Sequence, residues 1–339
     1  MLVSVLIDRR SCATGSEETM TMIDRYLDQL TASARAIIAA GYWTKPTAAL
    51  RHAHQETEFV ATLIDSCVGP LTVAWGNILQ NSGLDLTIRG AFLHQRPKIR
   101  FPSPTITACG EGHCELADLL IVHDHEDSAR RACLIQAKTD PGDPVMGAQK
   151  DLYERWEPFR FAAGPKSAKG QVYSVMPNDE GCRYGVVRLP PPANEEPWLA
   201  EQPLGTRGPV DMGLLLAEML AATLAQRPTP ARTAVIGGSN DWSILIDDLL
   251  AASLTSNYPL TGFWPVRRPR LSSQRLPIMA WVETSHDGWE AIASTADVST
   301  FRSSGPEKPA RAAEEGPDGI SVIHIRTTET GERKSRIVG

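Results

Sequence analysis

Two short apolar segments separated by a polar stretch constrain the fold of this chain more than any other feature. Residues 115–122 read ELADLLIV, and residues 132–138 read ACLIQAK. Apolar runs of this length, bounded by polar residues, are typical of buried strands. The polar stretch 123–131 predicts the turn of an antiparallel β-hairpin centred near Ser128. His123 and His125 are then expected to be solvent-exposed turn residues.

Three polar residues interrupt the apolar strands of this hairpin. With the centre near Ser128, Asp118 lies opposite Lys138, and Gln136 shares the face of Lys138 because side chains alternate along a strand. An aspartate and a lysine in apolar strands are costly to bury unless they are paired or bind a metal. We interpret them as a candidate active site. Asp118 and the carbonyl of Gln136 would bind Mg²⁺ or Mn²⁺, and Lys138 would stabilise charge on a phosphate. The alternative is a buried ion pair or an edge position.

The remaining elements follow from hydrophobic periodicity and from turn residues. The pattern predicts helices over 20–40, 45–67, 71–80, 148–157, 211–226 and 241–254, and strands over 84–89, 91–101, 171–176, 184–189, 277–282 and 320–326. Gly69 and Pro70 are expected to break the chain between two helices. The order of helix, strands, helix and strand predicts an α/β fold, with a mixed sheet flanked by helices.

The length of 339 residues predicts two domains, or one domain with large insertions. We expect an N-terminal leader and helix over 1–47, a catalytic core over 48–190 and a Pro- and Glu-rich linker over 191–210. Residues 211–339 are expected to form a C-terminal α+β region of unknown role.

The motif residues resemble those of a known nuclease family. ELAD followed by LIQAK resembles the restriction-endonuclease-like, or PD-(D/E)xK, nuclease superfamily, and the QxK form resembles its Mrr-like branch. The resemblance covers residues 48–190. It implies a restriction-endonuclease-like core with extra N-terminal helices, in which Asp118, Gln136 and Lys138 are catalytic.

Two positions depart from the family pattern. Ala117 stands where the family has proline, and Gln136 stands where the usual residue is acidic. A neutral Gln136 means that another carboxylate must help to hold the cation, and the family often takes it from the first core helix. Glu58 is our first candidate and Glu56 the second. A third is Glu115, three residues before Asp118.

Gln149 and Tyr153 lie at positions i and i+4 of the predicted helix after the hairpin, so they share a face. This QxxxY pair resembles an additional motif of RecB-type nucleases. The resemblance implies that these side chains contact a phosphate or brace Lys138. The alternative is an ordinary surface helix.

Substrate contacts require local basic residues, because the net charge of the chain is −6. Arg96, Lys98 and Arg100 recur at period two on one predicted strand, so they share a face. A second cluster contains Arg267, Arg268, Arg270 and Arg275. Both clusters could bind phosphates, and the alternative for both is solvated surface charge.

The resemblance implies a metal-dependent endonuclease that hydrolyses phosphodiester bonds in DNA. Stand-alone nucleases of this type are commonly restriction or anti-phage effectors, so it also implies a role in defence, with a homodimer or a defence-system protein as partner. Two alternatives stay open: an RNA-cleaving effector, and a non-catalytic nucleic-acid-binding or assembly protein that keeps the fold. The opening residues lack a basic segment before their apolar run, and no window has about 20 apolar residues. We therefore expect a cytoplasmic protein without a membrane partner.

Overall fold

A computed structural model describes most of the chain. The described residues are 14–43, 55–92, 97–102, 113–126, 129–140, 148–163, 165, 168, 170–176, 180–189, 196–205, 208–225, 231–254, 280–285 and 320–330.

Within these residues, nine strands form one mixed sheet. They are β1 (Leu84–Phe92), β4 (Leu119–His125), β5 (Ala129–Asp140), β7 (Cys182–Arg188), β8 (Trp198–Glu201), β9 (Val210–Asp211), β10 (Arg232–Ala234), β11 (Ala280–Ser285) and β12 (Ser321–Glu329). The spatial order is β11-β1-β12-β4-β5-β7-β8-β9, and β10 pairs with part of β5. Strand β4 is antiparallel to β5 and parallel to β12, and β5 is parallel to β7, so the predicted hairpin lies in the middle of the sheet.

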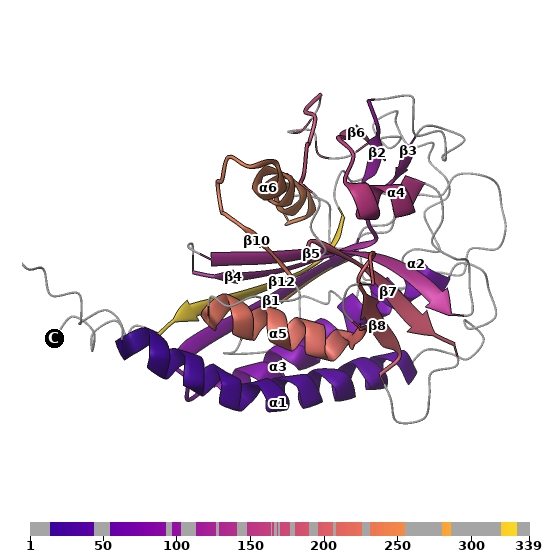
Figure 1. Ribbon diagram of the computed structural model, residues 1–339. Helices are drawn as coiled ribbons and strands as arrows, with labels where there is room; N and C mark the ends of the chain where they lie inside the picture. The colour runs from indigo at the N-terminus through magenta and orange to yellow at the C-terminus, as the bar shows by residue number, and fades with distance from the viewer. Residues whose placement is uncertain are drawn as a thin grey trace, which may run out of the picture.

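Both faces of the sheet are covered (Figure 1). Helices α1 (Thr14–Trp43), α3 (Val68–Leu79) and α5 (Met212–Ala225) pack below it in this view, and α2 (Gln55–Thr62) leads through a π-helical turn (Leu63–Cys67) into α3. Above it lie α4 (Ala148–Arg155), α6 (Asp241–Leu254) and a small sheet of β2 (Lys98–Arg100), β3 (His113–Glu115) and β6 (Arg160–Ala163). Because both faces of the sheet are covered here, residues 119–122 of β4 and 132–135 of β5 are apolar without alternation.

The mixed α/β architecture agrees with the sequence analysis, whereas the assignment to a restriction-endonuclease-like core stays a prediction. None of the described helices is long and apolar enough to cross a membrane. Several expected elements differ from the observed ones. Helix α3 starts at Val68 and includes Pro70, which is tolerated because the first N–H groups of a helix have no intrahelical partner. Residues 171–176 make a single bridge at Tyr173 rather than a strand, and β8 lies inside the predicted linker.

The last described strand, β12, comes from the region that we assigned to a separate C-terminal part. It lies between β1 and β4, pairing with β1 from Leu84↔Glu329 to Ala91↔Val322 and with β4 from Leu119↔Ser321 to His125↔Thr327. The domain boundaries stay a prediction, but this strand belongs to the same sheet as the hairpin. A pairing between segments so far apart in the chain leaves no local pattern in the sequence.

The hairpin itself is present, but its register differs from the expected one. The pairing runs from His125↔Ala129 to Leu119↔Ile135, a register that is symmetric about position 127 instead of 128. Asp118 therefore faces Gln136, not Lys138. The prediction placed the whole polar stretch 123–131 in the turn, whereas residues 123–125 and 129–131 are paired strand residues.

His123 and His125 are strand residues of β4, not exposed turn residues. The His123 side chain is fully buried, and burial lowers its pKa to about 3. Its Nε2 lies 2.9 Å from the Thr327 hydroxyl of β12, and His125 Nδ1 lies 3.1 Å from the same hydroxyl. The expectation of exposure was wrong because β12 supplies a buried polar partner.

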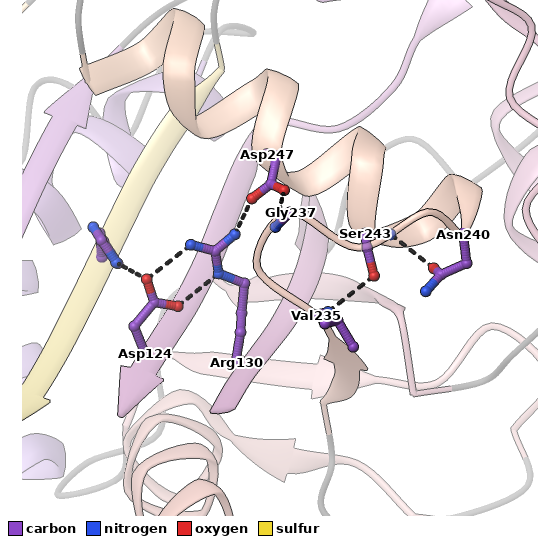
Figure 2. A network of polar contacts seen from close by, with 8 residues as sticks. Asp124, Arg130, Val235, Gly237, Asn240, Ser243 and Asp247 are labelled. Carbon is purple, nitrogen blue, oxygen red and sulfur yellow. Dashed lines mark hydrogen bonds and ion pairs between the residues drawn. The ribbon is translucent and has the colours of Figure 1, made fainter. Parts of the chain in front are cut away.

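Next to these histidines, a buried ionic network joins β4, β5, β12 and α6. The guanidinium of Arg130 donates to both carboxylate oxygens of Asp124, at 2.6 and 2.9 Å, and it also contacts Asp247. Figure 2 shows Arg130 between these two carboxylates, with Asp247 reaching down from α6. His324 of β12 binds Asp124 at 2.9 Å. Burial alone would raise the pKa of Asp124, but Arg130 and His324 outweigh it and hold the pKa well below its usual range.

Replacing Arg130 with methionine tests whether this network holds the sheet together. The change leaves the Asp124 carboxylate, only 7% exposed, without its bidentate partner. We expect the free energy of unfolding to fall by about 3–5 kcal/mol, as is usual when one member of a buried ion pair is removed. The measurement is urea unfolding followed by circular dichroism. Arg131→Met is the matched control, since Arg131 is partly buried and donates a hydrogen bond to the Thr233 hydroxyl rather than to a buried carboxylate. Equal stability of the two variants would contradict the role given to Arg130.

Candidate active site

Asp118 lies at the open end of the hairpin, one residue before β4 begins. Its backbone N–H donates to Ile135 O at 3.0 Å, which extends the pairing by one step. Its carboxylate accepts a hydrogen bond from the Ala137 N–H at 2.8 Å and another from the side-chain amide of Gln136. The β4–β5 pairing stops at Ile135, and the carboxylate takes an N–H of β5 beyond that point. Asp118 is therefore anchored by the sheet.

Helix α4 supports this arrangement through the two residues of the QxxxY motif. Gln149 Nε2 donates to Gln136 Oε1 at 3.1 Å, and the Tyr153 hydroxyl donates to the Leu116 carbonyl at 3.0 Å. One residue thus orients the partner of Asp118, and the other holds the chain two residues before it. Both hydrogen bonds brace the chain around Asp118 rather than around Lys138, and the expected contact with a phosphate stays a prediction.

Lys138 shares the face of Gln136, two residues further along β5, and its ammonium contacts α2. The Nζ atom lies 3.5 Å from both carboxylate oxygens of Glu56, and the two side chains are 15% and 32% exposed. Glu56 was our second candidate for the additional carboxylate. The sequence held a signal for it, because Glu56, Phe59, Val60 and Leu63 recur at i, i+3, i+4 and i+7, and the three apolar residues are buried. The side chain of Glu58 lies outside the described part of the structure, so its role stays a prediction.

Glu115, our third candidate, ends β3 and lies directly opposite Lys98 of β2. Burial raises the pKa of Glu115, and the charge of Glu56 adds to this rise. The charges of Lys98 and Lys138 oppose it. Glu115 therefore belongs to the same electrostatic cluster as Glu56 and Lys138.

Asp118 experiences the strongest effect of this cluster. Burial raises the pKa of Asp118 to about 8, and the charges of Glu115 and Glu56 act in the same direction. The ammonium of Lys138 and the hydrogen bond from Ala137 oppose the rise without cancelling it. The carboxylates at this end of the hairpin are thus not fully compensated by the lysines beside them, and added positive charge would stabilise their ionised forms.

The carboxylates at this end of the hairpin are suitable ligands for a hard divalent cation, but those that the structure describes do not form a complete binding site. Carboxylate oxygens are the ligands that Mg²⁺ and Mn²⁺ prefer, and Mg²⁺ usually keeps several waters. In the portion of the chain that the structure covers, no three His, Cys, Asp or Glu side chains form a complete metal-binding group. Gln136 turns its amide nitrogen toward Asp118 and its oxygen toward Gln149, so its oxygen reaches a cation only after the amide rotates. Asp118 is the residue best placed to hold a cation, with Glu56 and Glu115 beside it.

The predicted substrate-binding residues separate into two groups. Lys98 and Arg100 lie on β2 of the small sheet, with Ile99 between them buried in the core. Arg96 and the cluster of Arg267, Arg268, Arg270 and Arg275 lie outside the described residues. Sequence reasoning missed Arg160 of β6, which lies directly opposite Arg100.

No family model, no curated protein and no solved structure matches this chain. The function must therefore be argued from the geometry of the site.

Tyr153→Phe tests whether the hydrogen bond from α4 to the Leu116 carbonyl stabilises the protein. The change leaves the buried Leu116 carbonyl without its donor, which typically costs about 1–3 kcal/mol. Tyr184→Phe is a matched control, because Tyr184 stacks on Tyr153 at 5.6 Å and its buried hydroxyl has no hydrogen-bond partner in the described structure. We expect chemical unfolding to show a loss of stability for Tyr153→Phe only. A loss of equal size in both variants would show that the hydroxyl bond to Leu116 is not what matters.

Proposed function

We propose that this protein is a metal-dependent nuclease that hydrolyses phosphodiester bonds in DNA. One observation carries the proposal: a partly buried aspartate, two neighbouring glutamates and a partly exposed lysine gather at the open end of the hairpin. Strongly shifted pKa values produced by burial and specific charged neighbours are typical of functional sites. The resemblance of the same residues to the PD-(D/E)xK pattern supports the proposal independently of the geometry.

Each residue then has a distinct role. Asp118, together with Glu56 or Glu115, would hold Mg²⁺ or Mn²⁺, and a bound cation supplies an activated water and charge stabilisation at a phosphate. Lys138 places an ammonium on the same face, where it stabilises negative charge on the phosphate oxygens. The Glu56 carboxylate 3.5 Å away holds this ammonium in position until a phosphate takes its place. Gln136, Gln149 and Tyr153 position Asp118 and are not expected to touch the substrate.

A second candidate function is a nucleic-acid-binding protein that keeps this fold without catalysis. The orientation of Gln136 favours this candidate. One carboxylate oxygen of Asp118 accepts hydrogen bonds from both the Ala137 N–H and the Gln136 amide, so that oxygen already has partners within the protein. An RNA-cleaving effector on the same residues is a third candidate. A role in restriction or anti-phage defence follows from the resemblance alone and is part of the same proposal.

The test is cleavage of plasmid DNA and of a structured RNA, each titrated with Mg²⁺ and Mn²⁺. We expect the wild-type protein to nick or linearise DNA in the presence of metal. Lys138→Ala should lower the rate by about 10²–10³, which is typical when one transition-state electrostatic donor is removed. Lys150→Ala is the control, because Lys150 is an exposed lysine of α4 that pairs with Glu154 at 3.8 Å.

Three results would overturn parts of the proposal. Undiminished cleavage by a folded Lys138→Ala protein would remove Lys138 from the site. Cleavage of RNA but not of DNA would establish the RNA-cleaving alternative. Binding of DNA without cleavage under any metal condition would leave the non-catalytic alternative.

A further inference from the structure

The small sheet beside the candidate site carries two arginines directly opposite each other. Arg100 of β2 pairs with Arg160 of β6, and on its other side Arg100 pairs with His113 of β3. Both arginines are exposed, and neither has an ion pair or a side-chain hydrogen bond to any other residue that the structure describes. Like charges directly opposite each other destabilise a sheet. An anion between the two guanidinium groups would remove this repulsion.

This pair continues into the candidate site. Lys98 is two residues from Arg100 on the same face of β2, about 6.6 Å along the strand. Lys98 lies opposite Glu115, which belongs to the carboxylate cluster around Asp118. A basic strip of Lys98, Arg100 and Arg160 therefore leads outward from the cluster, on a protein whose net charge is −6.

The chemistry of the strip favours contacts to a phosphate backbone rather than to bases. Proteins that hold single strands usually offer aromatic side chains on which bases stack. The aromatic residue of β6, Phe161, instead packs toward the core, with its ring 5.4 Å from that of Tyr173 and 6.4 Å from that of Phe159. Arginine guanidinium groups bind phosphate oxygens in a bidentate manner.

We propose that Lys98, Arg100 and Arg160 form a docking surface for the phosphate backbone of duplex DNA, which directs the duplex toward the carboxylate cluster. The choice of DNA over another polyanion rests on the proposed function. Arg100 and Arg160 clamp phosphates away from the reacting bond, and Lys98 lies between this clamp and the cluster. The strip holds the duplex without reading its sequence, since phosphate contacts carry no base information.

The test is fluorescence anisotropy with a labelled DNA duplex of about 20 base pairs, roughly two helical turns, in EDTA so that binding is measured without cleavage. We expect Arg100→Gln/Arg160→Gln to weaken binding at least about tenfold. The slope of log K against log salt concentration should fall by about 2, because each neutralised phosphate contributes about 0.9 to it. Arg100→Lys/Arg160→Lys keeps both charges and should keep the slope. Arg326→Gln is the control, since Arg326 is an exposed arginine of β12 near the hairpin turn, at the other end of the main sheet.

Unchanged affinity and slope in a double variant whose circular dichroism matches wild type would overturn the inference. Tight binding of a duplex RNA of the same sequence, without binding of the DNA, would overturn the assignment to DNA. Failure of the proposed function would give a different result from failure of the docking surface. If wild type binds DNA through these arginines but cleaves nothing, the docking surface stands and the nuclease does not. If wild type cleaves DNA and the double variant binds it equally well, only the docking surface falls.

Discussion

The pairing of β12 with β4 and the buried ionic contacts of Asp124 hold the centre of the sheet together. Asp124 of β4 binds Arg130 of β5 and His324 of β12, so one carboxylate joins three central strands. Arg130 extends the network to Asp247 of α6, the helix that covers one face (Figure 2). A buried carboxylate with partners on several elements tolerates no shift of one strand relative to another. The network therefore favours the hairpin register that places Asp118 opposite Gln136.

The hairpin has an aspartate near each end, and the neighbours of the two aspartates shift their pKa values in opposite directions. At the turn end, Asp124 has partners in fixed geometry, and they lower its pKa despite burial. At the open end, Asp118 is partly buried, and burial together with the negative charges of Glu115 and Glu56 raises its pKa to about 8. The charge of Asp124 at the turn end is neutralised by side chains of the protein. The arrangement at the open end favours a cation from outside, which is why we place function at the open end and stability at the turn end.

Local pattern was sufficient to predict the hairpin, the main helices and the residues that gather at its open end. Asp118, Gln136 and Lys138 could be found because polar residues in buried strands are conspicuous, and Gln149 and Tyr153 because they share a helix face. The central position of β12 could not be predicted, since nothing near Ser321–Glu329 in the sequence marks β4 as its neighbour. His123 was misassigned for the same reason, because its partner Thr327 belongs to β12. Arg160 was missed because the strand that carries it was not expected.

We propose that the carboxylates at the open end of the hairpin bind a divalent cation through Asp118. Titration of the protein with Mn²⁺, followed by electron paramagnetic resonance of the free ion, tests this most directly. We expect wild type to bind Mn²⁺ and Asp118→Asn to abolish this binding. Asp85→Asn, which changes an exposed carboxylate of β1, should bind as wild type does. Equal Mn²⁺ binding by wild type and by a folded Asp118→Asn protein, or no binding by wild type, would contradict the account.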